Sequence, residues 1–254
     1  MLLFSHWAYA DDGLKAYWDA AQEFQQQIEQ KAVAGSVPRL SDAKAEHLFS
    51  ILSDHKRFLH KRKYGLKDVA ELSLVCRKNT ELLMHYMMFG VKEALQDTRD
   101  PQQIIEVLQI LAAKNSIVYQ NEAMAFLPFS VYCSARLIPL ASEIMSSLKK
   151  EEITEIRLQG IRQMKAGIFN IYEGLLRVLN QIEINHAHKL YLAKALADSS
   201  EQYLSFIPLD ERAKIIAVVK ETQKASAPDV RRQLDKIITT LSSKECGWVC
   251  QLDI

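Results

Sequence analysis

The chain has 254 residues, of which 48% are hydrophobic and 25% are charged, an ordinary globular composition that argues against disorder. Its 32 basic and 31 acidic residues nearly cancel, so we expect no nucleic-acid partner. Only 8 glycines and 6 prolines are present, too few for the many tight turns of a β-sandwich or β-barrel. The composition therefore predicts an all-α protein built from long helices.

The first ten residues resemble the end of a secretory signal peptide, because they are mostly apolar and contain Ala8-Tyr9-Ala10, a small-x-small cleavage pattern. No basic residue precedes Lys15, and the apolar run before Ala8 is shorter than a whole signal peptide needs. We expect residues 1–10 to be a remnant of a longer signal peptide, and the protein to be periplasmic or secreted. An apolar N-terminus docked on the core of a cytoplasmic protein is the alternative. No other window looks apolar enough for a membrane span.

Two helices are predicted before residue 65. The first runs from Asp11 or Asp12 to Gly35, and its apolar residues recur at spacings of three and four: Leu14, Tyr17, Trp18, Ala21, Phe24 and Ile28. The second runs from about residue 41 to Tyr64-Gly65.

A cluster of cations lies near the end of the second predicted helix: Lys56, Arg57, Lys61, Arg62 and Lys63. At a helix C-terminus these side chains meet the negative end of the dipole, while Phe58 and Leu59 anchor the segment on the core. If the cluster binds a partner, an acidic protein surface is favoured over phosphate or nucleic acid.

A third helix is predicted from about residue 66 to residue 95, with a bend or break at Gly90. Asp100 as cap and Pro101 at the first position start a fourth helix, whose apolar residues are Ile104, Leu108, Leu111 and Val118. Prolines at 128 and 139 predict short or kinked helix over residues 125–140. Three more helices are expected near 186–206, 209–224 and 228–243, giving a bundle of about eight or nine helices in one domain, residues 11–254.

The longest helix is expected over about residues 150–183. Glycines recur on it every seven residues, at Gly160, Gly167 and Gly174, although glycine inside a helix costs up to ~1 kcal/mol relative to alanine. Their common face predicts that another helix packs unusually close there. The neighbour is either another part of this chain or a second copy that makes a homodimer through residues 160–182. The alternative is that a long helix simply tolerates three glycines.

The four cysteines are expected to form two disulfides. Cys246 and Cys250 close a short ring at the C-terminal tail, and Cys76 and Cys133 join two predicted helices. A redox pair and a zinc site fit less well, because the spacing of the tail pair is one residue too long for Cys-x-x-Cys and no further ligands recur nearby. In a cytosolic protein Cys76 and Cys133 would be buried thiols.

The chain contains no phosphate-binding loop, no dinucleotide-binding glycine pattern, no His-Glu-x-x-His and no Gly-x-Ser-x-Gly. One metal site remains conceivable on helices, from Glu81, His85, Glu183 and His186. We therefore expect a non-enzymatic helical protein without cofactors that binds another protein after export, in its sharpest form an immunity- or inhibitor-type protein. A metal-dependent helical-bundle enzyme and a cytosolic adaptor or regulator are the alternatives.

Overall fold

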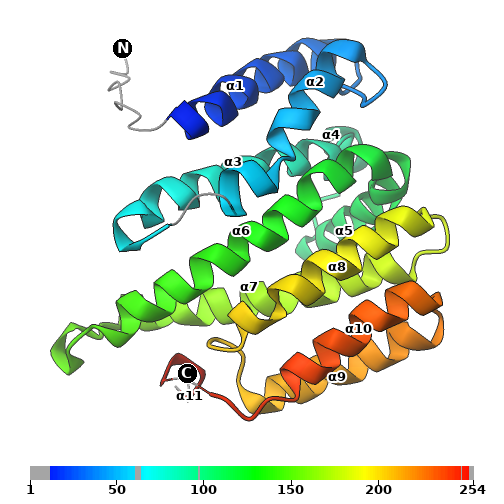
Figure 1. Ribbon diagram of the computed structural model, residues 1–254. Coiled ribbons are helices and arrows are strands. Elements are labelled where there is room, and N and C mark those ends of the chain that lie inside the picture. The colour runs from blue at the N-terminus through cyan, green and yellow to red at the C-terminus, as the bar shows by residue number, and fades with distance from the viewer. Residues whose placement is uncertain (1–11, 61–63, 97, 247, 252–254) are drawn as a thin grey trace.

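A computed structural model describes residues 12–60, 64–96, 98–246 and 248–251 (Figure 1). Within these residues the chain has eleven α-helices and no strand, and nine of the helices have seven or more residues, which confirms the all-α bundle. The elements, with three short π or 3-10 segments labelled η, are α1 (Asp12–Val33), α2 (Ala43–Leu52), η1 (Lys56–His60), η2 (Leu66–Asp68), α3 (Val69–Met87), α4 (Val91–Ala94), α5 (Pro101–Val118), α6 (Gln120–Ser146), η3 (Lys150–Glu152), α7 (Glu155–Asn180), α8 (His186–Tyr203), α9 (Leu209–Lys224), α10 (Pro228–Leu241) and α11 (Trp248–Gln251).

The helices lie in successive layers, and α6 runs through the middle of them (Figure 1). α1 and α2 pack on each other at one end of the molecule, and α3 packs along α6. α6 also packs against α8, α8 against α10, and α10 against α9, while α7 contacts α8 and α9. α5 joins this stack through α3, α4 and α6.

The predicted apolar stripes point into one continuous core, which extends from Leu14 in α1 to Val249 in the C-terminal tail. Aromatic rings hold its N-terminal part together. The Phe49 ring of α2 lies 4.9 Å from that of Phe24 in α1 and 5.5 Å from that of Phe126 in α6, measured between centroids. Pairs of this geometry stabilise a core beyond the effect of the area they bury.

Several helix ends lie where the sequence predicts them. The side chain of Asp100 caps α5 by accepting a hydrogen bond from the Gln102 backbone N–H, and Pro101 is the first residue of that helix. Gly90, with φ of 81°, separates α3 from α4. This left-handed conformation is one that a residue without a Cβ adopts without strain, so the third predicted helix breaks there.

α6 is one unbroken helix of 27 residues, although Pro128 and Pro139 lie inside it. The sequence instead predicts short or kinked helix here. Each proline removes one backbone hydrogen bond. α6 is nevertheless packed between α3 and α8, so burial of the apolar residues around both prolines offsets this loss. The helix predicted to be the longest, over 150–183, corresponds to α7. α6 is one residue longer than α7, so the longest described helix is α6 instead.

By length and composition alone, α6 is also a candidate membrane span, and it is the one such helix in the described part of the chain. The sequence argument expects no such segment. Of the window that passes this test, 56% is buried inside the fold. The central helix of a bundle acquires the same composition, because neighbouring helices cover it on several sides.

The second predicted helix is divided in the structure. α2 ends at Leu52, and residues Lys56–His60 form η1, a single π-helical turn. The backbone turns between these two elements, since the Ser53 oxygen accepts a hydrogen bond from the His55 N–H. Short π segments are rare and occur frequently at functional sites.

Candidate functional site

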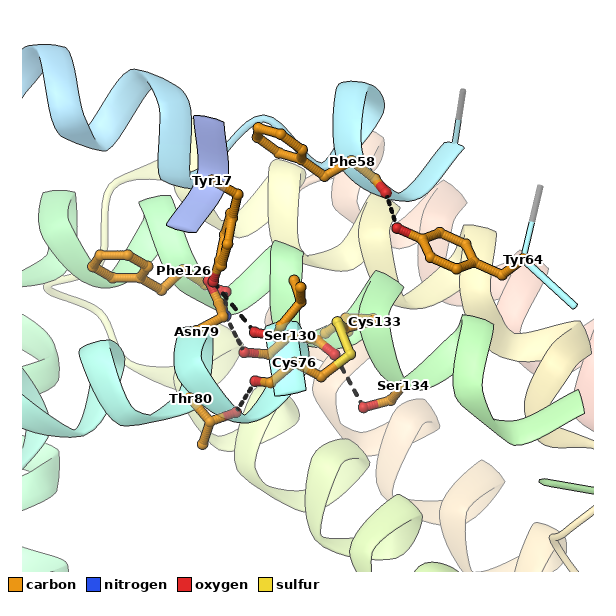
Figure 2. The surroundings of a disulfide bond; sticks show 12 residues. Tyr17, Phe58, Tyr64, Cys76, Asn79, Thr80, Phe126, Ser130, Cys133 and Ser134 are labelled. Atoms are coloured by element: carbon orange, nitrogen blue, oxygen red, sulfur yellow. Dashed lines mark hydrogen bonds between the residues drawn. A yellow bond between two sulfur atoms is a disulfide. The ribbon is translucent and has the colours of Figure 1, made fainter. Parts of the chain in front are cut away.

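A disulfide joins the two central helices α3 and α6. Cys76 and Cys133 are bonded with a Cα–Cα distance of 5.6 Å, as the sequence predicts (Figure 2). One turn further along α3, the buried side-chain amide of Asn79 donates to the Phe126 backbone oxygen at 3.0 Å and to the Ser130 hydroxyl at 2.7 Å. The two helices are therefore held by a covalent bond and by polar contacts at the same level of the bundle.

The second predicted disulfide, between Cys246 and Cys250, closes a short ring in the C-terminal tail with a Cα–Cα distance of 5.4 Å. Its residue Cys250 is buried, and the sulfur lies 3.8 Å from a guanidinium nitrogen of Arg212 in α9. The tail is thus packed against the body of the protein through Cys250, and the disulfide keeps the tail itself in a closed ring.

Among the described residues, Arg212 is the largest fully buried side chain, with an exposed fraction of 1%. Its guanidinium donates hydrogen bonds to the backbone oxygens of Leu204, Ile207 and Ser243, at 2.7, 2.9 and 2.7 Å. Burial lowers the pKa of Arg212, because desolvation disfavours its charged form. Three backbone carbonyls therefore stabilise a buried cation that fastens the tail to the α8–α9 connection.

The described part of the basic segment lies on η1, beyond the end of α2 at Leu52, so Lys56 and Arg57 do not occupy the last turns of a long α-helix as the sequence predicts. Lys56 and Arg57 are exposed on η1, and Lys61-Arg62-Lys63 lies outside the described residues. Phe58 and Leu59 are buried, as predicted for the residues that anchor the segment on the core.

Two histidines of this segment form a ring cluster with Tyr132 of α6. The His55 ring stacks on the Tyr132 ring at 4.4 Å between centroids and 8° between planes, and the His60 ring lies nearly perpendicular to both. The Tyr132 hydroxyl is 3.3 Å from Asp198 of α8, to which it donates a hydrogen bond. Burial, and then the charge of Asp198, raise the pKa of Tyr132. Burial lowers the pKa of His55 and of His60.

We expect the protein to lose stability as the pH falls from about 7.5 to about 5. The pKa of His55 lies below its ordinary 6.5 in the folded state, so the unfolded chain takes up the proton first and unfolding is favoured at the lower pH. His55→Phe keeps a flat ring against Tyr132 but cannot titrate, so its stability should vary less with pH. The free energy of unfolding in urea at each pH measures this effect.

The same substitution at the exposed His47 in α2 provides the control. His47→Phe should keep the pH dependence of the unsubstituted protein. If His55→Phe follows that same pH dependence, burial of His55 is not its source.

The three glycines of α7 do not pack closely against any other described part of the chain. A Cβ atom built at Gly160, Gly167 or Gly174 would meet no neighbouring atom within 4 Å. The prediction of a close helix within this chain is therefore wrong. Because the glycine face is uncovered, its backbone is accessible to a further helix, and a homodimer through residues 160–182 stays a prediction.

An apolar groove of about 490 Å³ opens between α5 and α7, and Gly174 lies on one of its walls. Residues from α3 and α6 also line it. The apolar members of the lining are Met87, Met88, Ile105, Leu108, Ala112, Ala113, Leu127, Val131, Ile171, Gly174, Leu175 and Val178. We call this surface the α5–α7 groove.

α5 contributes unusually little to the core. The residues of this helix that are buried are Asn115 and Ser116, both polar, whereas its apolar residues are half-buried or exposed. Ile105 is 50% exposed and Ile110 is 62% exposed. The apolar pattern of the fourth predicted helix is therefore real, but the stripe is only partly covered by the rest of the described chain.

The four residues considered as metal ligands are Glu81, His85, Glu183 and His186. Glu81 forms ion pairs with Arg77 and Lys78, at 3.4 and 3.6 Å, and His186 Nε2 lies 2.9 Å from Asp229 Oδ2. Across the described residues no group of three or more His, Cys, Asp or Glu side chains is placed to hold a metal ion. The four-residue site of a metal-dependent bundle enzyme is therefore not assembled in this structure.

Comparison with models of protein families, with curated proteins and with solved structures finds no match to this chain.

Sequence reasoning did not identify Arg212 or Tyr132 as important polar residues. For Arg212 a signal exists, since Ile215, Val219 and Thr222 follow it at spacings of three, four and three, and all are buried. A charged residue on the buried face of a helix needs internal hydrogen bonds, which the structure supplies. The stacking of Tyr132 on His55 depends on tertiary contacts and has no comparable local signal.

Proposed function

We propose that this chain is a non-enzymatic binding protein that takes an amphipathic helix of another protein into the α5–α7 groove. The observation that carries the proposal is α5, an 18-residue helix whose aliphatic side chains all stay half-buried or exposed. Soluble monomers rarely leave contiguous apolar surface of this kind uncovered unless it binds something. A helix laid in an apolar groove is a recurrent mode of recognition.

The form of the groove supports a helix as its occupant. Helices α5 and α7 form the two sides of the groove. Gly174 allows the backbone of a partner helix to approach α7 closely. Polar side chains of Gln109, Asn170 and Arg177 also line the groove, where they can bond the polar flank of such a helix. A second copy of this chain is an alternative occupant that the exposed glycine face favours.

The two disulfides support an oxidising compartment, so we place the function after export, in the periplasm or outside the cell. In the sharper form of the proposal the partner is a toxin or an envelope enzyme, and the chain is an immunity- or inhibitor-type protein. The separation of the four metal candidates favours this proposal over the bundle enzyme.

We expect a photo-crosslinking residue at Ile105 to trap one partner of defined mass in the source cells, because Ile105 lines the groove. The matched control is the same residue at Ile110 on the same helix, which is more exposed and does not line the groove. Mass spectrometry measures the mass and the yield of the adducts formed from positions 105 and 110.

Ala112→Arg, which places a long charged side chain in the groove, should abolish the adduct from position 105 while leaving the helix content unchanged. An adduct of equal yield from position 110, or one that survives Ala112→Arg, would contradict the proposal. The mass of the adduct also separates a second copy of this chain from a different protein.

A further inference from the structure

A second, polar cavity lies where η1, α6 and α8 meet, and the proposed helix binding does not use it. Its volume is about 210 Å³. The polar side chains that line it come from three separate parts of the chain: His60, Tyr132, Arg136, Asp198, Ser199 and Gln202.

Two polar atoms of this cavity lack a hydrogen-bond partner in the described structure. Ser199 is completely buried, and its hydroxyl makes no hydrogen bond; the Gln202 Oε1 atom is also buried and unpaired. By contrast, the neighbouring Ser200 hydroxyl donates to the Leu196 backbone oxygen at 2.7 Å and accepts a hydrogen bond from Tyr172 at 2.9 Å. Because a buried polar atom without a partner costs free energy, two of them in one cavity indicate space for a polar ligand. The Ser199 hydroxyl can donate to the oxygens of such a ligand, whereas the Gln202 Oε1 atom only accepts and needs a donor such as the hydroxyl of a protonated phosphate.

The charges of the cavity favour an anion. Its acidic residue, Asp198, is already paired, with Lys194 Nζ at 2.6 Å and the Tyr132 hydroxyl at 3.3 Å. Its basic residue, Arg136, has no ion pair with any described carboxylate and is exposed at the cavity. Arg136 is close enough to contribute, after burial and His55, to the lowered pKa of His60. An arginine without an ion pair to a described carboxylate therefore faces a cavity whose own carboxylate, Asp198, is already paired with Lys194.

We propose that this cavity binds a small oxyanion, the phosphate or carboxylate group of a small molecule, through the Arg136 guanidinium and the Ser199 hydroxyl. The planar guanidinium matches two oxygens of such a group at once. The Ser199 hydroxyl supplies a neutral donor at the buried end, and the imidazole of His60 supplies a third. The volume accommodates a ligand of a few heavy atoms, so the site differs from the α5–α7 groove in both size and chemistry.

The test titrates the full, disulfide-bonded protein with inorganic phosphate and, separately, with acetate at matched ionic strength. Calorimetry and the NMR signals of the His60 ring report binding. We expect saturable binding of at least one anion, and Arg136→Gln should weaken it by about tenfold or more. Ser199→Ala, which removes only the hydroxyl, should weaken it by about fivefold. Binding of phosphate alone assigns a phosphate group, and binding of acetate alone assigns a carboxylate.

The matched control is Arg232→Gln, at an exposed arginine that lines no part of the cavity and should leave binding unchanged. An equal loss in Arg232→Gln would show that net charge alone attracts the anion and would overturn the proposal. Unchanged binding in Ser199→Ala would show that the anion binds without this hydroxyl, and no saturable binding of either anion would show that the cavity holds only water. Either result would overturn the proposal. Photo-crosslinking from position 105 does not depend on this result, so the two proposals fail separately.

Discussion

Replacing Cys76 and Cys133 together by alanine is expected to lower the free energy of unfolding by about 4 kcal/mol. The bond closes a loop with a sequence separation of 57 residues, and its loss frees that loop in the unfolded chain. Equilibrium unfolding in urea, compared with the unsubstituted oxidised protein, measures the difference.

The tail disulfide supplies the matched control, because Cys246 and Cys250 are separated by only 4 residues. On the same loop-entropy argument, replacing this pair by alanine should cost about 2 kcal/mol. An equal effect of the two double substitutions would contradict the loop-entropy explanation and would point to the local contacts of each bond.

Arg212→Met is expected to lower the free energy of unfolding by at least about 3 kcal/mol. Methionine has a similar length and fills most of the space, but it cannot donate to the backbone oxygens of Leu204, Ile207 and Ser243. Three carbonyls would then lose these donors, and those of Leu204 and Ile207 are buried away from water. Urea unfolding measures the loss, and partial proteolysis of the tail reports whether Ser243 is released.

Arg231→Met is the control for this prediction. Arg231 is exposed on α10 and donates one hydrogen bond, to the Ser226 backbone oxygen at 3.1 Å. Its replacement should change stability by less than about 1 kcal/mol. If the two substitutions cost the same, the buried position of Arg212 has no special role.

The sequence predicts the parts of the fold that depend on local signals. Spacing of apolar residues identifies α1 and α10, and Asp100 with Pro101 identifies the start of α5 because both act within one helical turn. The two disulfides were also predictable, since few pairings of four cysteines are compatible with a short C-terminal ring.

Other features depend on contacts that no local pattern contains. α6 continues through Pro128 and Pro139 because α3 and α8 pack on it, so tertiary burial overrides a helix-breaking residue. Likewise, seven-residue spacing places three glycines on one face of α7, but it does not tell whether that face is covered.

The candidate sites were the least predictable part. The polar cavity between η1, α6 and α8, proposed to bind an oxyanion, combines Arg136 with Ser199. These residues belong to different helices and meet only in the folded protein. One local signal was present: Ser199 follows Leu192 and Leu196 and precedes Tyr203 at helical spacing, which places a hydroxyl on the buried face of α8. A polar residue in such a stripe indicates either an internal hydrogen bond or a ligand.

The bond between Cys76 and Cys133 makes a macrocycle of the intervening chain, and α5 lies within it. A helix that buries so little of its surface would otherwise be among the first to detach in local fluctuations. Covalent closure restricts these excursions and keeps the α5 side of the proposed binding groove preorganised. Reduction of this bond would therefore loosen α5 together with the loop that carries it, and the shape of the proposed binding groove would then depend on the redox potential of its surroundings.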